Sequence, residues 1–167
     1  MKTKIIFLCH GNICRSPMAE YIMKSLVKKA GIENEFEITS GAVSTEEIGN
    51  PIYPPAQRKL NEKAIPYGNH RAHKITPQEF AVQDVVIVMD NSNIRLLKGI
   101  VGDSPQICSK IHKMMEFAAT NNRLRQINIP DVADPWYTGD FEQTYIDITE
   151  GCKGLIAYCQ TNRCNLP

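Results

Sequence analysis

Cys9 and Arg15 stand six positions apart near the start of the chain, and Ser16 follows the arginine directly. Four apolar residues at 5–8 precede the cysteine, and Pro17 follows the serine. A thiolate sulfur is a nucleophile, and a guanidinium is a planar fork of donors that suits two oxygens of a phosphate-like group. These residue types at this spacing favour a site in which a thiolate lies beneath a bound phosphate group and attacks its phosphorus in line.

The loop over residues 9–16 must lie between a strand and a helix for this chemistry to work. The apolar run before it predicts a buried strand, and Ser16 with Pro17 predicts a helix start, with the serine as N-cap and the proline at the first helical position. Inward-facing N–H groups of such a loop, with the positive end of the helix dipole, form a cradle for anions. Cysteines in such surroundings have pKa values lowered to roughly 3.5–7.5 from about 8.5, so we expect a thiolate at Cys9.

Three other residues of the loop have side chains that suit a tight turn around an anion. Gly11 lets the chain turn sharply without a side chain intruding, and Asn12 tolerates a left-handed conformation and can bind the loop internally. His10 is expected to point outward near the mouth. A bare cysteine and arginine at this spacing also occur by chance, as a core cysteine beside a surface arginine.

A second reactive group lies late in the chain, at Asp134, which precedes Pro135, Trp136 and Tyr137. Phosphate transfer to a cysteine needs an acid to protonate the departing oxygen, and the same group, once ionised, can activate water. The proline holds Asp134 extended, and the two aromatic faces suit a slot for a flat ring. An Asp-Pro pair is by composition most often only a turn, so both interpretations stay open here.

The composition of the chain is that of a globular protein of ordinary size. The 167 residues, 43% hydrophobic and 22% charged, predict one domain over residues 1–167. A net charge of +1, with lysine and arginine scattered, favours neither nucleic acid nor a membrane as a partner, and the longest apolar runs are too short to cross a bilayer. The first residues show no secretory leader, and six cysteines around a reactive thiol fit a reducing, cytoplasmic location. No Cys/His cluster has zinc-like spacing, so we expect no metal and no cofactor.

Apolar spacing and turn residues predict the remaining elements. Strands are expected over residues 2–8, 36–40 and 84–89, with a brief edge strand over Ile107–Cys108, and helices over 17–30, 56–63, 91–98 and from Asp140 onward. A short helix should begin at Thr76, which forms a capping box with Glu79. Residues 110–119 have helical composition, and residues 120–133 are expected to form a polar connection. Alternating strands and helices predict an α/β fold, a three-layer sandwich with about four parallel strands.

The longer string at residues 7–20, FLCHGNICRSPMAE, resembles the signature loop of the low-molecular-weight protein tyrosine phosphatases. The resemblance implies a flavodoxin-like topology with strand order 2-1-3-4 and hydrolysis of phosphotyrosine on protein substrates through a phosphocysteine intermediate. It implies Cys9 as the nucleophile, Arg15 as the phosphate clamp and Asp134 as the general acid, since the family places an Asp-Pro-aromatic loop before its last helix. Phosphate, or another oxyanion, would bind the loop formed by His10, Gly11, Asn12, Ile13, Cys14, Arg15 and Ser16.

The resemblance also implies supporting roles. Ser16 would donate to the thiolate leaving group in the second step, besides capping the helix, and Asn12 and Ser40 would support the loop. His70 would brace them, although sequence alone suggests a surface or satisfied core histidine. Cys14 would be a redox partner that forms a reversible disulfide with the nucleophile, or simply a small residue that fills space.

The walls of the implied pocket are Ile13, Glu46, Trp136 and Tyr137. The family often has an aromatic residue near position 46, whereas residues 44–48 of this chain contain none. Selectivity on that side of the pocket therefore stays open.

Three relatives of the loop remain as alternatives. Arsenate reductases of this fold need further thiols shortly after the third strand, where residues 89–93 hold no cysteine. Protein arginine phosphatases carry a threonine where this chain has Ile13, whose apolar side chain should disfavour a guanidinium and favour a phenyl ring. Phosphocysteine carrier domains of sugar transport need neither a general acid nor a loop arginine, and both are expected here.

Overall fold

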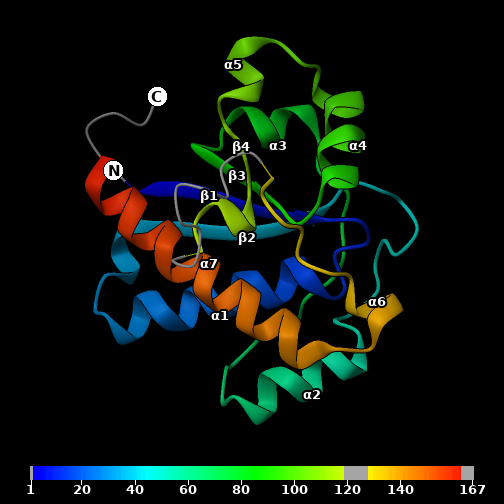
Figure 1. Cartoon of the computed structure of the whole chain (residues 1–167), viewed down its shortest axis with the longest axis vertical. Helices are drawn as coiled ribbons and strands as arrows, with labels where there is room; N and C mark the ends of the chain where they lie inside the picture. Colours follow the sequence, from blue (N-terminus) through cyan, green and yellow to red (C-terminus); the bar gives the residue numbers. More distant parts are fainter. Residues whose placement is uncertain (1, 119–127, 163–167) are drawn as a thin grey trace.

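Four parallel strands form the centre of the structure, a computed structural model that describes residues 2–118 and 128–162. The strands lie in the order β2-β1-β3-β4 (Figure 1). Their bounds are Thr3–Cys9 for β1, Phe36–Ala42 for β2, Val85–Val88 for β3 and Ile111–Lys113 for β4. The predicted parallel sheet and the strand order 2-1-3-4 are thus confirmed.

Helices cover both faces of this sheet (Figure 1). One layer contains α1 (Arg15–Lys29), α2 (Pro54–Glu62) and α7 (Phe141–Asn162), and the other contains α3 (Pro77–Ala81), α4 (Asn91–Val101) and α5 (Pro105–Cys108). A short helix α6 (Pro135–Thr138) precedes α7, and 3-10 segments lie at Glu33–Glu35 (η1) and Met114–Glu116 (η2). None of the helices in the described ranges has the length and apolar character needed to span a bilayer.

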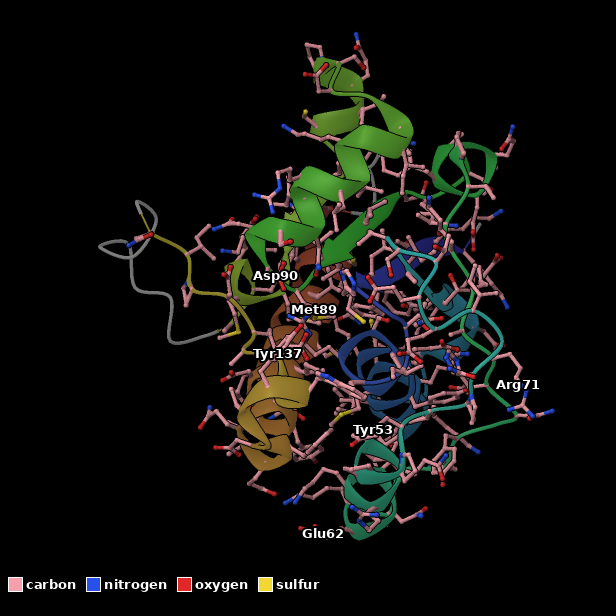
Figure 2. The ribbon with its side chains drawn as sticks, turned by 90° about the vertical axis from the view of Figure 1, so that its right-hand side faces the viewer. Tyr53, Glu62, Arg71, Met89, Asp90 and Tyr137 are labelled. Carbon is pink, nitrogen blue, oxygen red and sulfur yellow. The ribbon has the colours of Figure 1, made fainter. Side chains whose placement is uncertain are left out.

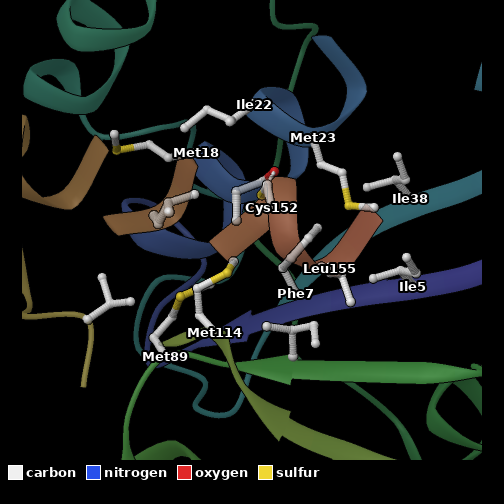
Figure 3. Close-up of a cluster of buried hydrophobic side chains, with 14 of the residues drawn as sticks. Ile5, Phe7, Met18, Ile22, Met23, Ile38, Met89, Met114, Cys152 and Leu155 are labelled. Atoms are coloured by element: carbon white, nitrogen blue, oxygen red, sulfur yellow. Dashed lines mark hydrogen bonds between the residues drawn. The ribbon is translucent and has the colours of Figure 1, made fainter. Parts of the chain in front are cut away.

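The alternation of side chains along β1 explains where the reactive cysteine lies. Ile5, Phe7 and Cys9 belong to the hydrophobic cluster under α1 and α7, whereas Ile6 and Leu8 pack in a second cluster on the opposite face. Figure 3 shows the first cluster, in which Phe7 and Ile5 lie beside side chains of α1 and α7 such as Met18, Met23, Cys152 and Leu155. Cys9 therefore ends its strand on the α1 side, at the edge of the sheet where parallel sheets bind ligands.

Helix α7 lies directly on the backbone that follows β4. A Cβ atom at Gly154 would stand 1.7 Å from the carbonyl oxygen of Phe117, and one at Gly151 would stand 2.3 Å from the Met114 sulfur. Only glycine fits at these two positions, because any side chain would meet the chain of η2. The same helix packs along α1, so the last helix completes the core on this face.

Helix α1 begins two residues earlier than its sequence pattern predicted. Its N-cap is Cys14 without a side-chain hydrogen bond, so the predicted cap at Ser16 is wrong, and Pro17 is the third helical residue rather than the first. The physical reason is that the Ser16 hydroxyl is engaged by Cys9, Asn12 and Gly41 and is not available to the helix terminus. A proline is tolerated at the third position because the first four N–H groups of a helix lack intrahelical acceptors.

The region around β4 also differs from its prediction. Residues Ile107–Cys108 are not an edge strand but end α5, which Ser104 caps by accepting a hydrogen bond from the Ile107 N–H at 3.4 Å. The edge strand lies at Ile111–Lys113, where it pairs with β3. The helical composition noted for residues 110–119 is therefore a wrong guide at 111–113, and within the described part it corresponds to a helix only in the 3-10 segment Met114–Glu116. Tertiary pairing overrides helical composition here. Residue 119 and most of the predicted polar connection, residues 120–127, lie outside the described residues.

Candidate active site

The sulfur of Cys9 lies inside the loop that joins β1 to α1. The backbone N–H groups of Asn12 and Ser16 donate hydrogen bonds to Sγ at 3.3 Å and 3.4 Å. The hydroxyl of Ser16 lies 3.0 Å from the same sulfur. Donors that converge on one atom stabilise negative charge there.

Asn12 is the centre of the hydrogen-bond network that holds this loop. Its backbone φ is 59°, the left-handed conformation that the sequence predicted for it. Its amide donates to the hydroxyls of Ser16 and Ser40 at 2.9 Å and 3.0 Å, and its Oδ1 accepts from the His73 N–H at 3.3 Å. The His70 ring lies against its backbone oxygen, with 2.7 Å between Nε2 and that atom. The predicted supporting residues Ser40 and His70 therefore do meet the loop.

The network continues to Glu20, which sequence analysis missed. The Ser40 hydroxyl donates to the Glu20 carboxylate at 2.6 Å, and Lys24 binds the other oxygen of that carboxylate at 2.5 Å. Glu20 is buried although it lies on α1 with a lysine four residues later. That spacing is typical of a surface ion pair, so the sequence gives no sign that the carboxylate faces inward. Its contact with Ser40 becomes visible only when β2 is placed beside β1 and under α1.

His70 is a neutral donor in this network. Burial lowers the pKa of its imidazole below the ordinary value, and the contact with the Asn12 carbonyl, which favours the protonated ring, only partly offsets that effect. A carbonyl oxygen can only accept, so a proton must lie on Nε2. The neutral ring with its proton on Nε2 meets both conditions.

Arg15 connects the Cys9 loop to two distant parts of the chain. Its side chain is buried, with 2% of the residue exposed. Nη1 donates to Asp90 at 2.6 Å and to the Val132 carbonyl at 3.0 Å. Nη2 donates to Asp134 at 2.7 Å. Burial works against its charge, but the negative charges of Cys9, Asp134 and Asp90 outweigh burial, so the pKa of the guanidinium lies above its ordinary value. Arg15 is therefore a permanent cation on one wall of the site.

Asp90 is the second residue that sequence analysis missed. It lies two residues after the end of β3, and besides pairing with Arg15 it caps α4 by accepting from the Asn93 N–H at 2.8 Å. Figure 2 shows it with Met89 on the side of the molecule that carries Tyr137. The available clue was its position at the carboxyl end of a strand next to β1, where parallel sheets gather functional side chains.

Asp134 lies opposite the Cys9 loop. Its Oδ2 binds Arg15, and its Oδ1 accepts from the Trp136 N–H at 3.1 Å, so it is the N-cap of the short helix α6, which sequence analysis did not predict. The interpretation of its Asp-Pro pair as a turn is therefore confirmed, and the general acid stays a prediction. The turn that caps α6 also directs a carboxylate at the guanidinium beside Cys9.

These groups surround a cavity of about 340 Å³. All four predicted wall residues line it, together with every residue of the Cys9 loop except Asn12 and Ser16, which are buried behind it. Four residues that were not predicted also line it: Glu47, Asp90, Ser92 and Asn93. At its mouth the His10 ring lies 2.9 Å from the Glu46 carboxylate, which agrees with the outward direction expected of His10. Trp136 and Tyr137 are 52% and 85% exposed, so their faces are open to an incoming molecule.

Cys14 lies in the same cavity as Cys9, and both are free thiols. Burial, and next the negative charges of Cys9 and Asp134, raise the pKa of the Cys14 thiol far above its ordinary value. Cys14 therefore stays protonated at neutral pH. Within the described residues, no three His, Cys, Asp or Glu side chains are grouped so as to hold a metal ion.

Comparison with known proteins agrees with this geometry. The family model described as "Low molecular weight phosphotyrosine protein phosphatase" matches residues 4–165. The chain belongs to this family. It is 33% identical to the low molecular weight protein-tyrosine-phosphatase YfkJ of Bacillus subtilis, over 95% of this chain and 97% of the relative. It is 35% identical to the low molecular weight phosphotyrosine protein phosphatase of Gallus gallus, over 91% and 92%.

Solved structures of the family share the whole fold. The crystal structure of YfkJ superposes with a TM-score of 0.88 at 32% identity, covering 98% of both chains. The YwlE arginine phosphatase, in a mutant whose active-site serine is phosphorylated, superposes with a TM-score of 0.81 at 25% identity, covering 97% of this chain and 99% of that one. The chain is thus an enzyme, a hydrolase of the low-molecular-weight protein-tyrosine-phosphatase class.

Proposed function

We propose that this enzyme hydrolyses phosphotyrosine on proteins through a phosphocysteine formed on Cys9, with Arg15 as the phosphate clamp and Asp134 as the general acid and base. The observation that carries the proposal is the 2.7 Å contact between Arg15 and Asp134 above the Cys9 loop. It brings a nucleophile, a phosphate-binding cation and an acid into one cavity, although the acid lies 119 residues after the arginine.

In the first step the Cys9 thiolate attacks phosphorus and forms a sulfur–phosphorus bond. The bond from phosphorus to the tyrosine oxygen breaks, and that oxygen takes the proton of the Asp134 carboxyl group. The inward N–H groups of the loop and the Arg15 guanidinium bind the phosphoryl oxygens as their charge changes. Tyrosine leaves neutral, and Asp134 becomes a carboxylate.

In the second step Asp134 acts as a base. It takes a proton from water, the water oxygen forms a bond to phosphorus, and the sulfur–phosphorus bond breaks. The sulfur leaves as a thiolate, which the Ser16 hydroxyl stabilises from 3.0 Å. Phosphate is released, and Asp134 is again protonated for the next cycle.

The surroundings of the two loop cysteines support Cys9 as the nucleophile. The N–H groups of Asn12 and Ser16 point at the Cys9 sulfur. The Cys14 thiol has a raised pKa and stays protonated, so it is a poor nucleophile. The proposed redox role of Cys14 fits its place in the same cavity and does not require it to be ionised at rest.

The lining of the cavity favours an aromatic leaving group. Ile13 is 8% exposed and packs with Cys14, Ala72 and the partly buried Tyr53, which gives the pocket an apolar wall, while Trp136 offers an aromatic face. Hydrolysis of phosphoarginine is the second candidate, and the structural likeness to the YwlE arginine phosphatase favours it. The alternatives of arsenate reduction and of a carrier receive less support, because Asp90–Asn93 supply no thiol and Asp134 supplies an acid.

The deciding experiment measures turnover of phosphotyrosine, phosphoserine and phosphoarginine peptides by the wild type, Cys9→Ser, Cys14→Ser and Asp134→Ala. Phosphotyrosine should be hydrolysed, Cys9→Ser should be inactive, and Cys14→Ser should stay active. Asp134→Ala should be slower by about 10²–10⁴-fold, the effect of a lost general acid. Preference for phosphoarginine would favour the second candidate, and phosphate uptake on Cys9 without turnover would make the chain a carrier.

A further inference from the structure

A buried lysine holds the chain segment that leads to Asp134. Lys113 is the last residue of β4, and its side chain is 7% exposed. Its ammonium lies 2.5 Å from the Asp131 carboxylate and donates to the Ile129 carbonyl at 2.7 Å. Burying an ammonium is unfavourable unless it is paired and hydrogen-bonded, so these contacts fix the segment that supplies them.

The segment continues to the catalytic side of the molecule through two more contacts. The Val132 N–H donates to the Met89 carbonyl at 2.9 Å, and the Val132 carbonyl accepts from Arg15 at 3.0 Å. Lys113 pairs with Val88 in the sheet, so its side chain anchors the segment at the end of β4, beside the end of β3 where Met89 lies. Asp134 follows Val132 by two residues.

We infer that Lys113 is a positioning residue for Asp134. By binding Asp131 and the Ile129 carbonyl, it holds residues 129–132 against the ends of β3 and β4 and so sets where the Asp134 carboxyl group meets the leaving oxygen. The inference rests on the proposed function, in which Asp134 is the general acid. Lys113 itself touches none of the reacting atoms.

If Lys113 acts through Asp134, its loss should affect substrates differently according to the acidity of their leaving group. A purely structural role would not have this effect. A leaving group that is a weak acid needs a proton in the first step, whereas a strongly acidic phenol departs without one. Loss of Lys113 should therefore harm kcat/KM for phosphotyrosine and spare kcat/KM for an aryl phosphate such as 2,4-dinitrophenyl phosphate. A general loss of folded protein would lower both equally.

The experiment is a double-mutant cycle with Lys113→Met and Asp134→Ala, in which kcat/KM is measured on both substrates. Lys113→Met alone should lower kcat/KM for phosphotyrosine by about tenfold, a part of the 10²–10⁴-fold effect of the acid. In the Asp134→Ala background it should change kcat/KM by less than about twofold, since residues that act as one unit are not additive. Lys113→Arg, which keeps the charge, should restore most of the activity.

Lys110→Met is the matched control. Lys110 also binds main-chain carbonyls, those of Ala81 at 3.2 Å and Gln83 at 2.9 Å, but it precedes β4 and lies at the other end of the strand. Its removal should leave the ratio of the two substrates unchanged. If Lys113→Met does not fold, Asp131→Asn provides the same test, because it weakens the anchor and leaves the buried lysine its bond to Ile129.

Equal losses on both substrates, or a full further loss in the Asp134→Ala background, would overturn the inference and leave Lys113 a structural residue. Failure of the proposed function has a different signature. In that case Asp134→Ala itself would show no dependence on the leaving group, whatever Lys113→Met does.

Discussion

Two loops face each other across the cavity, and they are held in different ways. The Cys9 loop, residues 9–16, is bound by its own N–H groups and by the side chains of Asn12 and Ser16 within it, and Ser40, His70 and His73 brace Asn12 from outside. The Asp134 loop, residues 129–134, is bound by groups far away in the sequence, Arg15, Met89 and Lys113. The first loop is shaped mainly by its own residues, and the second by the assembled sheet.

This difference determines how each loop responds to change. A substitution in the Cys9 loop alters the site where it is made. A substitution in β3, β4 or α1 can displace Asp134 without touching the cavity. Arg15 is the exception, because it belongs to the first loop and holds the second.

The largest effect is expected from Arg15→Lys, which should impair both loops together. Lysine lacks the planar fork that binds two phosphate oxygens, and it cannot hold Asp90, Val132 and Asp134 at once. We expect kcat/KM for phosphotyrosine to fall by about 10³-fold, in the range of a lost preorganised donor. Steady-state kinetics on phosphotyrosine measures this loss of kcat/KM. The control is Arg58→Lys, which changes an exposed arginine outside the cavity. A loss below about tenfold for Arg15→Lys would contradict the prediction.

Asn12 tests the local loop by itself. Asn12→Ala should lower the free energy of unfolding by about 1–3 kcal/mol, because buried partners such as Ser40 lose their hydrogen bonds. It should lower it by a further ~1 kcal/mol, because alanine is strained at a positive φ. Asn12→Gly keeps the first effect and avoids the strain. Urea unfolding of both variants should therefore rank wild type above Asn12→Gly above Asn12→Ala, and the reverse order of the two variants would refute the strain.

The smallest effect expected is the pH dependence contributed by His70. Its pKa is lowered in the folded protein, so below about pH 6.5 the unfolded chain binds more protons than the folded one. The stability from the neutral ring is fully present above that pH and is lost as the pH falls towards the folded pKa. His70→Gln keeps a donor for the Asn12 carbonyl but cannot titrate.

The measurement is urea unfolding of wild type and His70→Gln at several pH values between about 5.5 and 7.5. The advantage of the wild type should shrink as the pH falls. A difference that stays constant with pH would show that His70 does not titrate differently on folding.

The sequence predicted the Cys9 loop well because its spacing is a local property. Cys9, Arg15 and the left-handed Asn12 all follow from residues that are neighbours in the chain. Asp90 and Glu20 were not predicted as members of the site, nor Lys113 as the proposed anchor of the Asp134 loop, since each contact forms only when strands pair or a helix face is buried. The same cause explains the error at Ile107–Cys108, where the pairing of β3 selected Ile111–Lys113 instead.

The predicted cap at Ser16 failed for a different reason. Serine before a proline is a common helix start. That local pattern contains no information on the Cys9 sulfur, which lies 3.0 Å from the Ser16 hydroxyl in the folded chain. Asp134, by contrast, was predicted as the acid only through the family resemblance, because its turn residues and aromatic neighbours by themselves left a plain turn open. Its contact with Arg15 is not local, and only the fold supplies it.

The packing of α7 on α1 also orders events during translation. Cys9 is added to the growing chain 125 residues before Asp134, by subtraction of their numbers, and α7 is added later still. At about 5–20 residues per second, the ribosome needs roughly 6–25 s to cover that distance. For this interval the nascent chain holds Cys9, the proposed nucleophile, without Asp134, the proposed acid. It also holds Met18 and Ile22 of α1 without the helix that covers them. A ribosome-bound chain that stops before α7 should therefore recruit chaperones and should not release phosphate.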